Sequence, residues 1–185
     1  MVFVFRGEIL EPICFVEYVN YSKEYVMFET QEERDQNLRV FKNMAETTDQ
    51  FAPMFVSDLG GKTTAIVVPF EKPEDKEMFS KIIKVMILKE AITGFAFATE
   101  SWMTQLPANS TVDPQDLLQL KPEDRPHTTE CMMVVFSNGK GEYTYLGRLD
   151  RVRGKRIVRD WELMPQSGLS GQFTNLWRNA KAVTN

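Results

Sequence analysis

The chain has 185 residues, 43% of them hydrophobic and 26% charged, and a net charge of −4. This composition suffices for one domain with a sizeable core and excludes a disordered chain. No apolar run approaches the roughly 20 residues that a membrane-spanning helix needs, and no basic segment precedes the first apolar residues. We therefore expect a cytoplasmic protein with no membrane partner and no cleaved signal.

Two cysteines, Cys14 and Cys131, and a single histidine limit the metal and redox chemistry of the chain. Both cysteines lie in apolar runs, which predicts reduced, buried thiols rather than a disulfide. One histidine and two separated cysteines exclude the usual spacings of zinc ligands. The leading expectation is therefore a protein without a cofactor.

The N-terminal part predicts strands followed by a helix. Residues 2–28 are rich in aromatic and β-branched residues, which favours two or three short strands. Thr30 and Glu33 have the spacing of a capping box, in which each side chain satisfies a backbone amide of the other residue. Apolar residues at helical spacing then predict an amphipathic helix over 31–49 that covers one face of a sheet.

Two strands, 53–59 and 63–70, are predicted to form a hairpin at Gly60-Gly61. The sequence Gly60-Gly61-Lys62-Thr63 is superficially similar to a phosphate-binding loop. However, Val56 stands where the first glycine of that motif belongs, and a strand follows instead of a helix. A hairpin turn is the preferred interpretation.

The segment 73–91 predicts a helix that begins at Pro73 and is apolar nearly all round in its later half. Such a helix is expected to be buried on most of its surface. Together with the strands 63–70 and 92–103 it forms a predicted β-α-β unit, whose two strands run parallel. The later strands instead follow one another through short turns, so we expect a mixed sheet.

The C-terminal half predicts a long exposed loop over 104–129, an apolar strand over 130–136, antiparallel hairpins at 137–140 and 153–155, and a helix over 169–182. The predicted fold is a single α+β domain over residues 1–185. It has a mixed β-sheet with one β-α-β unit, C-terminal antiparallel hairpins and three main helices.

The densest group of candidate site residues flanks the 104–129 loop. Alternation along a strand places Glu100 and Trp102 on one face, and charged residues close the loop before the next strand. The candidate binding residues are Glu100, Trp102, Asp124, Arg125, His127 and Glu130. The structural alternative is a salt-bridged strand entry. In it Trp102 plugs the core edge, Glu100 pairs with a nearby arginine, and Arg125 holds Glu100 or Glu130.

The same residues allow an alternative enzymatic interpretation. Oxygen ligands with one imidazole suit Mg or Mn, so Glu100, Asp124 and Glu130 with His127 are an alternative metal site. A metal-dependent phosphate-bond hydrolase would then use His127 and Glu130 in catalysis, with His127 as general base. No diagnostic spacing supports this alternative, so catalytic residues are not assigned in the leading interpretation.

A basic hairpin is the third candidate. Residues 147–185 contain eight Lys and Arg against three Asp and Glu. The cations of the predicted hairpin are Arg148, Arg151, Arg153, Lys155, Arg156 and Arg159. A basic ribbon can follow phosphates and bind nucleic acid, but the acidic overall charge opposes this. The structural alternative is a solvated hairpin paired with Asp150, Asp160 and Glu162.

One stretch resembles a family. The sequence Glu100-Ser101-Trp102-Met103, followed by Pro122-Glu123-Asp124-Arg125 and then by Glu130 before an apolar strand, resembles small uncharacterised proteins of bacteriophages and bacteria. The resemblance covers residues 63–138, and His127 with two threonines departs from the pattern. It implies a phage-related source and an α+β domain, but no activity. The leading hypothesis is a non-enzymatic interaction protein, a phage accessory factor that binds a host or phage protein.

Overall fold

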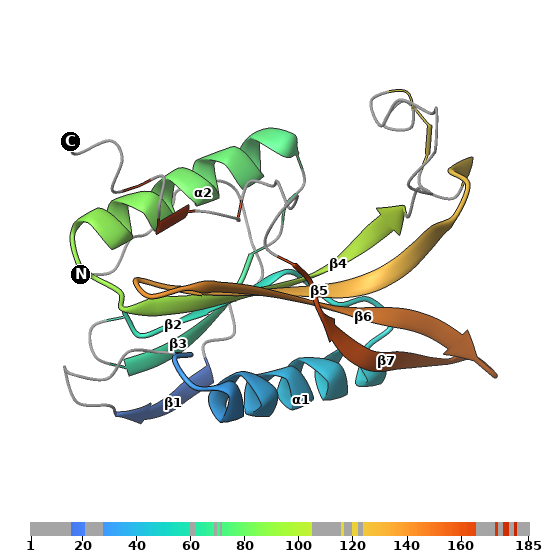
Figure 1. Cartoon of the computed structure of the whole chain (residues 1–185), viewed down its shortest axis with the longest axis horizontal. Coiled ribbons are helices and arrows are strands. Elements are labelled where there is room, and N and C mark those ends of the chain that lie inside the picture. The colour runs from blue at the N-terminus through green and yellow to red at the C-terminus, as the bar shows by residue number, and fades with distance from the viewer. Residues whose placement is uncertain are drawn as a thin grey trace, which may run out of the picture.

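The computed structural model describes residues 16–20, 28–59, 62–68, 70, 72–104, 116, 120–121, 124–165, 173, 176–177 and 180. One antiparallel sheet carries helix α1 (Gln31–Thr47) on one face and helix α2 (Pro73–Leu88) on the other (Figure 1). The strands are β1 (Val16–Asn20), β2 (Met54–Ser57), β3 (Lys62–Val67), β4 (Gly94–Thr104), β5 (Thr128–Asn138), β6 (Glu142–Val152) and β7 (Lys155–Leu163). The α+β class is therefore as predicted.

The strand order is β1-β3-β2-β4-β5-β6-β7, and every described ladder is antiparallel. The predicted mixed sheet is therefore wrong for the described part of the chain. β3 and β4 do run in the same direction on either side of α2 in sequence. However, β2 lies between them and pairs antiparallel with both. β2 thus separates the two strands of the predicted β-α-β unit, which were expected to lie adjacent or near each other in one sheet.

The predicted start of α1 is confirmed. Thr30 Oγ1 accepts from the Glu33 amide at 3.2 Å, and Glu33 Oε2 accepts from the Thr30 amide at 3.0 Å. The helix buries Leu38, Phe41 and Ala45 against the sheet. The capping box therefore fixes where the helix begins, and the apolar stripe fixes which face meets the sheet.

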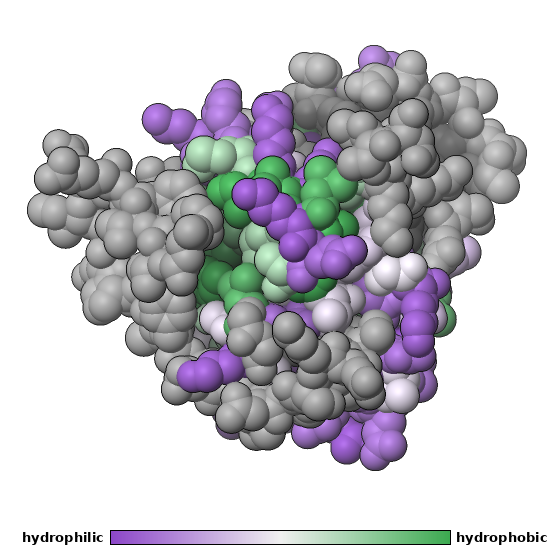
Figure 2. Space-filling view, turned by 90° about the vertical axis from the view of Figure 1, so that its left-hand side faces the viewer, coloured by the Kyte–Doolittle hydropathy of each residue, from purple (hydrophilic) through white to green (hydrophobic). Residues whose placement is uncertain are grey.

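Helix α2 is exposed on a larger part of its surface than predicted. Ile83 and Ile87 are buried against the sheet, whereas Met78, Val85 and Leu88 are 53%, 49% and 41% exposed. Figure 2 looks at the end of the molecule where α2 leads into β4, and it shows hydrophobic residues gathered there among hydrophilic ones. Neither described helix combines the length and apolar character that crossing a bilayer requires.

Two cores lie on the two faces of the sheet, and the strands divide their side chains between them. Along β4, Ala96 and Ala98 belong to the core under α1, whereas Phe95 and Phe97 belong to the core under α2. Successive strand residues point to opposite faces. The same alternation therefore places Glu100 and Trp102, farther along β4, on the α1 side.

Both predicted C-terminal hairpins are present, joining β5 to β6 and β6 to β7. In the first turn the Asn138 side chain accepts from the amides of Lys140 and Gly141, each at 2.9 Å. In the second turn Arg153 and Gly154 both have positive φ, 51° and 78°. Two consecutive positive φ values match the twist of antiparallel strands, and glycine adopts them without strain.

Parts of the prediction fall largely outside the described residues. They include most of the strands expected over 2–28, the 104–129 loop and the helix expected over 169–182. Within that last range the structure describes Leu176, Trp177 and Ala180 as helical, with Leu176 and Ala180 buried in the core under α2. Of the three main helices predicted, two are described over their whole length.

Candidate functional site

The candidate site lies where the sheet continues past the ends of both helices (Figure 1). β4 and β5 pair without interruption up to Thr104 and Thr128, and Trp102 is the direct partner of Glu130. Glu130 is on the α1 side, because Met132 and Val134 of the same strand belong to the core under α1. The register therefore brings together three of the predicted binding residues, Glu100, Trp102 and Glu130, on one face.

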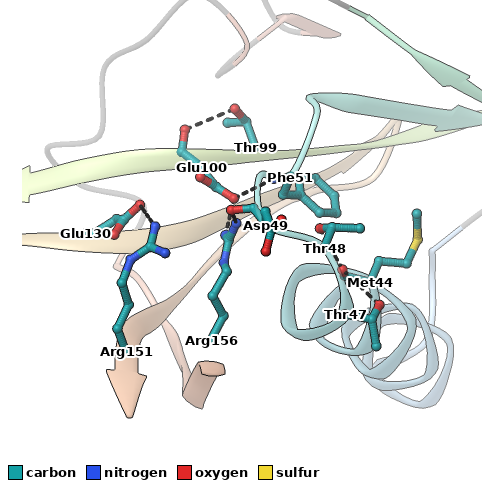
Figure 3. Close-up of polar contacts among 10 residues, drawn as sticks. All are labelled: Met44, Thr47, Thr48, Asp49, Phe51, Thr99, Glu100, Glu130, Arg151 and Arg156. Atoms are coloured by element: carbon teal, nitrogen blue, oxygen red, sulfur yellow. Dashed lines mark hydrogen bonds and ion pairs between the residues drawn. The ribbon is translucent and has the colours of Figure 1, made fainter. Parts of the chain in front are cut away.

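Glu100 is held in a structural ion pair. Its carboxylate accepts from the Phe51 amide at 2.7 Å and pairs with Arg156 of β7 (Figure 3). Arg156 also donates to the Asp49 carbonyl, and its side chain is only 4% exposed. The interpretation that Glu100 pairs with an arginine is confirmed. This pair, together with Phe51 and Asp49, joins β4, β7 and the segment after α1.

Trp102 is open to solvent. The Trp102 residue is 44% exposed, so the interpretation that Trp102 plugs the core edge is wrong. Trp102 lies near the end of β4, two residues before Thr104, which forms the last pair with β5. The indole therefore remains available for contact with another molecule.

Within the described residues, the ion-pair partner of Glu130 is distant. Arg151 Nη2 lies 4.0 Å from Glu130 Oε1, and the two side chains are 60% and 22% exposed. Figure 3 shows Arg151 extending from β6 towards β5, beside the closer pair of Arg156 and Glu100. Exposed ion pairs of this kind contribute about 0–1 kcal/mol to stability. We refer to Trp102, Glu130 and Arg151 as the Trp102 surface.

The other predicted binding residues, Asp124, Arg125 and His127, lie in the turn before β5. Arg125 Nε donates to the Leu120 carbonyl at 3.0 Å, so the hypothesis that Arg125 holds Glu100 or Glu130 is wrong. Asp124 and His127 are exposed, and His127 has φ of 55°. These side chains shape the entry to β5, whereas the strands fix the residues of the Trp102 surface.

The alternative Mg or Mn site is not formed. Glu100, Asp124, His127 and Glu130 all belong to the described residues, among which no three acidic, histidine or cysteine side chains gather closely enough to hold a metal ion. Glu100 is turned to Arg156 and Glu130 to Arg151. His127 and Glu130 therefore lack the arrangement that the hydrolase alternative requires.

The basic hairpin is divided between the two faces of the sheet. Asp150 accepts from Arg148 Nε at 2.8 Å and from Arg159 Nε at 2.7 Å. The hydrogen bond from Arg159, helped by Arg148, holds the pKa of Asp150 below its ordinary value. Arg156 is buried on the opposite face, and Arg153 and Lys155 are exposed at the turn. The six cations therefore form no continuous phosphate-binding track, and the pairing predicted with Asp150 is confirmed.

Two features of the α1 side were missed from the sequence. The Glu46 carboxylate at the end of α1 accepts a hydrogen bond from the Val158 amide of the edge strand β7 at 2.9 Å, which blocks the addition of another strand at that point.

The second feature is a groove of about 320 Å³, which is lined by Gln31, Asp35, Leu38, Arg39, Tyr145, Trp161 and Leu163. Within it the Gln31 amide already bonds Asp35 and Tyr145. The Gln31 side chain in the groove is thus used for internal contacts.

The remaining reactive group, Cys131, is buried on β5 as predicted. Burial, followed by the charge of Glu130, raises the pKa of its thiol to about 11. The thiol is therefore protonated at neutral pH and is a poor nucleophile.

No family model, curated protein or solved structure matches the chain.

Proposed function

We propose that this protein is a non-enzymatic interaction protein that binds a protein partner through the Trp102 surface. The observation that carries the proposal is the exposure of Trp102, a residue that is 44% exposed although it lies within the paired part of β4. Tryptophan is enriched among the residues that dominate binding energy at protein interfaces. The Trp102 surface presents a tryptophan next to the Glu130 carboxylate.

The rigidity of the surface supports binding. β4 and β5 form eleven consecutive residue pairs, from Gly94–Asn138 to Thr104–Thr128, and the Thr104 and Thr128 hydroxyls share a hydrogen bond of 2.6 Å at the end. Binding at such a ladder does not have to order the backbone, so this part of the entropic cost of association is absent. The backbone that carries Trp102 is therefore preformed.

The alternatives have less support. A hydrolase needs convergent acidic groups, and the predicted ones are turned to separate arginines. A nucleic-acid binder needs free cations, and of the six on the basic hairpin only Arg153 and Lys155 are exposed without an ion pair in the described structure. Protein binding uses the exposed Trp102 together with the Glu130 carboxylate, whose charge opposes the phosphates of a nucleic acid.

The Glu100–Glu130 region resembles small phage and bacterial proteins. We therefore extend the proposal to the origin of the protein and to the compartment in which it acts. We place the protein in the cytoplasm as a phage accessory factor that acts on a host or phage protein. This part of the proposal depends on the sequence pattern alone. Purification from phage-infected cells tests it, since the partner is then present.

The test is affinity purification of the wild-type protein, Trp102→Ala and Val40→Ala from those cells. Val40 lies on α1 and is 49% exposed, so it matches Trp102 in exposure but belongs to a different surface. A stoichiometric protein should be recovered with the wild type and with Val40→Ala, and lost with Trp102→Ala. Equal recovery with all three would contradict the proposal.

A further inference from the structure

We infer that the Trp102 surface accepts an arginine side chain of the partner, with the guanidinium stacked on the Trp102 indole and bonded to the Glu130 carboxylate. This inference rests on the proposed function and names the chemistry of the contact. It starts from the strand register, in which Trp102 and Glu130 are direct partners. Direct cross-strand partners have Cβ atoms about 4.5–5.5 Å apart, so one ligand group can touch both side chains.

The two carboxylates on this face differ in availability. Glu100 is occupied by the Phe51 amide and by Arg156, whose side chain is 4% exposed. Among the described residues, Glu130 is reached only by Arg151, which lies 4.0 Å away; the Arg151 side chain is 60% exposed and the Glu130 side chain 22%. A cation from outside can therefore replace Arg151 at Glu130, but it cannot replace Arg156 at Glu100.

An indole beside a carboxylate favours a cation. A cation over an exposed tryptophan ring contributes about 0.5–1 kcal/mol, and more when water is excluded. Arginine suits this geometry better than lysine, because its planar guanidinium stacks on the ring while its edge donates hydrogen bonds to a carboxylate. The partner's arginine would thus take the place that Arg151 holds loosely in the free protein.

The experiment uses the full chain and the peptide Ac-Gly-Arg-Gly-NH2, with the citrulline peptide as a neutral control of the same shape. Binding is followed by the NMR signal of the Trp102 indole N–H, which is assigned by its loss in Trp102→Phe. The arginine peptide should shift this signal in the millimolar range, and the citrulline peptide should not. Equal shifts with both peptides would overturn the inference.

Two variants give opposite expected results. Glu130→Gln removes the acceptor charge and should weaken binding about three- to tenfold, as expected for loss of one exposed charge-assisted hydrogen bond. Arg151→Gln removes the competing cation and should strengthen binding, whereas Val40→Ala should change nothing. If the surface instead binds an acidic group at Arg151, Ac-Gly-Glu-Gly-NH2 will shift the signal and Arg151→Gln will abolish the effect, which overturns the inference.

Failure of this inference differs from failure of the proposed function. If the arginine peptide gives no specific shift but Trp102→Ala still loses its protein partner in cells, the inference is overturned and the proposed function stands. If the peptide binds as described but no partner depends on Trp102, the arginine site is supported and the proposed interface is not.

Discussion

Arg153 and Arg156 lie on the same hairpin and look alike in the sequence, yet they have different roles. Arg153 is exposed in the turn with φ of 51°, whereas Arg156 is buried and pairs with Glu100. Alternation along β7 places Arg156 on the same face as Val158, which belongs to the core under α1. The partner itself lies on β4, far away in sequence, so local patterns cannot predict this ion pair.

Charge reversal separates the two arginines. Arg156→Glu places a second carboxylate against Glu100 in a largely buried site, so the free energy of unfolding should fall by about 3 kcal/mol or more. Arg153→Glu, in the exposed turn, should change it by less than about 0.5 kcal/mol. Urea denaturation of both variants checks this. Equal stabilities would show that the Glu100–Arg156 pair does not hold β7 to β4.

The thiol of Cys131 is expected to resist alkylation. Because burial raises its pKa to about 11, the thiolate is scarce at neutral pH and becomes abundant only as the pH rises towards that value. Iodoacetamide at neutral pH should leave Cys131 unmodified in the native protein and modify it in denaturant. Peptide mapping by mass spectrometry separates it from Cys14. Rapid native modification of Cys131 would contradict the burial of β5.

The burial of individual residues of α2 cannot be predicted from the apolar content of the helix alone. Its later half is apolar nearly all round, and from this we predicted burial on most of its surface. The sheet offers only one face to the helix, so Ile83 and Ile87 are buried while Val85 stays 49% exposed. By contrast, α1 was predicted well, since its capping box and single apolar stripe are both local signals.

Two alanine substitutions on α2 measure this difference. Ile83 is completely buried, so Ile83→Ala should lower the free energy of unfolding by about 2–5 kcal/mol through lost contacts and a cavity. Val85→Ala should change it by no more than about 0.5 kcal/mol, because alanine also favours a helix. Thermal denaturation of the two variants provides the comparison. A large loss with Val85→Ala would mean that this face is covered.

At the scale of the whole molecule, the α+β class and the hairpins were predictable, but the strand order was not. Asn138 and Arg153-Gly154 mark their turns locally. The place of β2 between β3 and β4 depends on contacts between segments far apart in sequence, which a single sequence does not display. The pairing of Trp102 with Glu130 also depends on contacts between strands that the 104–129 loop separates. Both residues were predicted as candidate binding residues, but the exposure of Trp102 could not be predicted from the sequence.

The distribution of charge over the molecule predicts weak nucleic-acid binding. The net charge is −4, and Arg148, Arg156 and Arg159 are tied to acidic partners. A gel-shift assay at low salt with random DNA and RNA should show no complex at micromolar protein. If a complex forms, the exposed pair Arg153→Glu with Lys155→Glu should remove it. Such a salt-sensitive complex would restore the nucleic-acid hypothesis.

The most direct test of the central claim is site-specific photocrosslinking in phage-infected cells. p-Benzoylphenylalanine replaces Arg151, which is 60% exposed and belongs to the Trp102 surface, in one version of the protein and Val40, on α1, in another, so that Trp102 itself is kept. The account predicts a covalent adduct with one partner protein from position 151 and none from position 40. An adduct only from position 40, or none from position 151 while a partner co-purifies, would show that the Trp102 surface is not the interface.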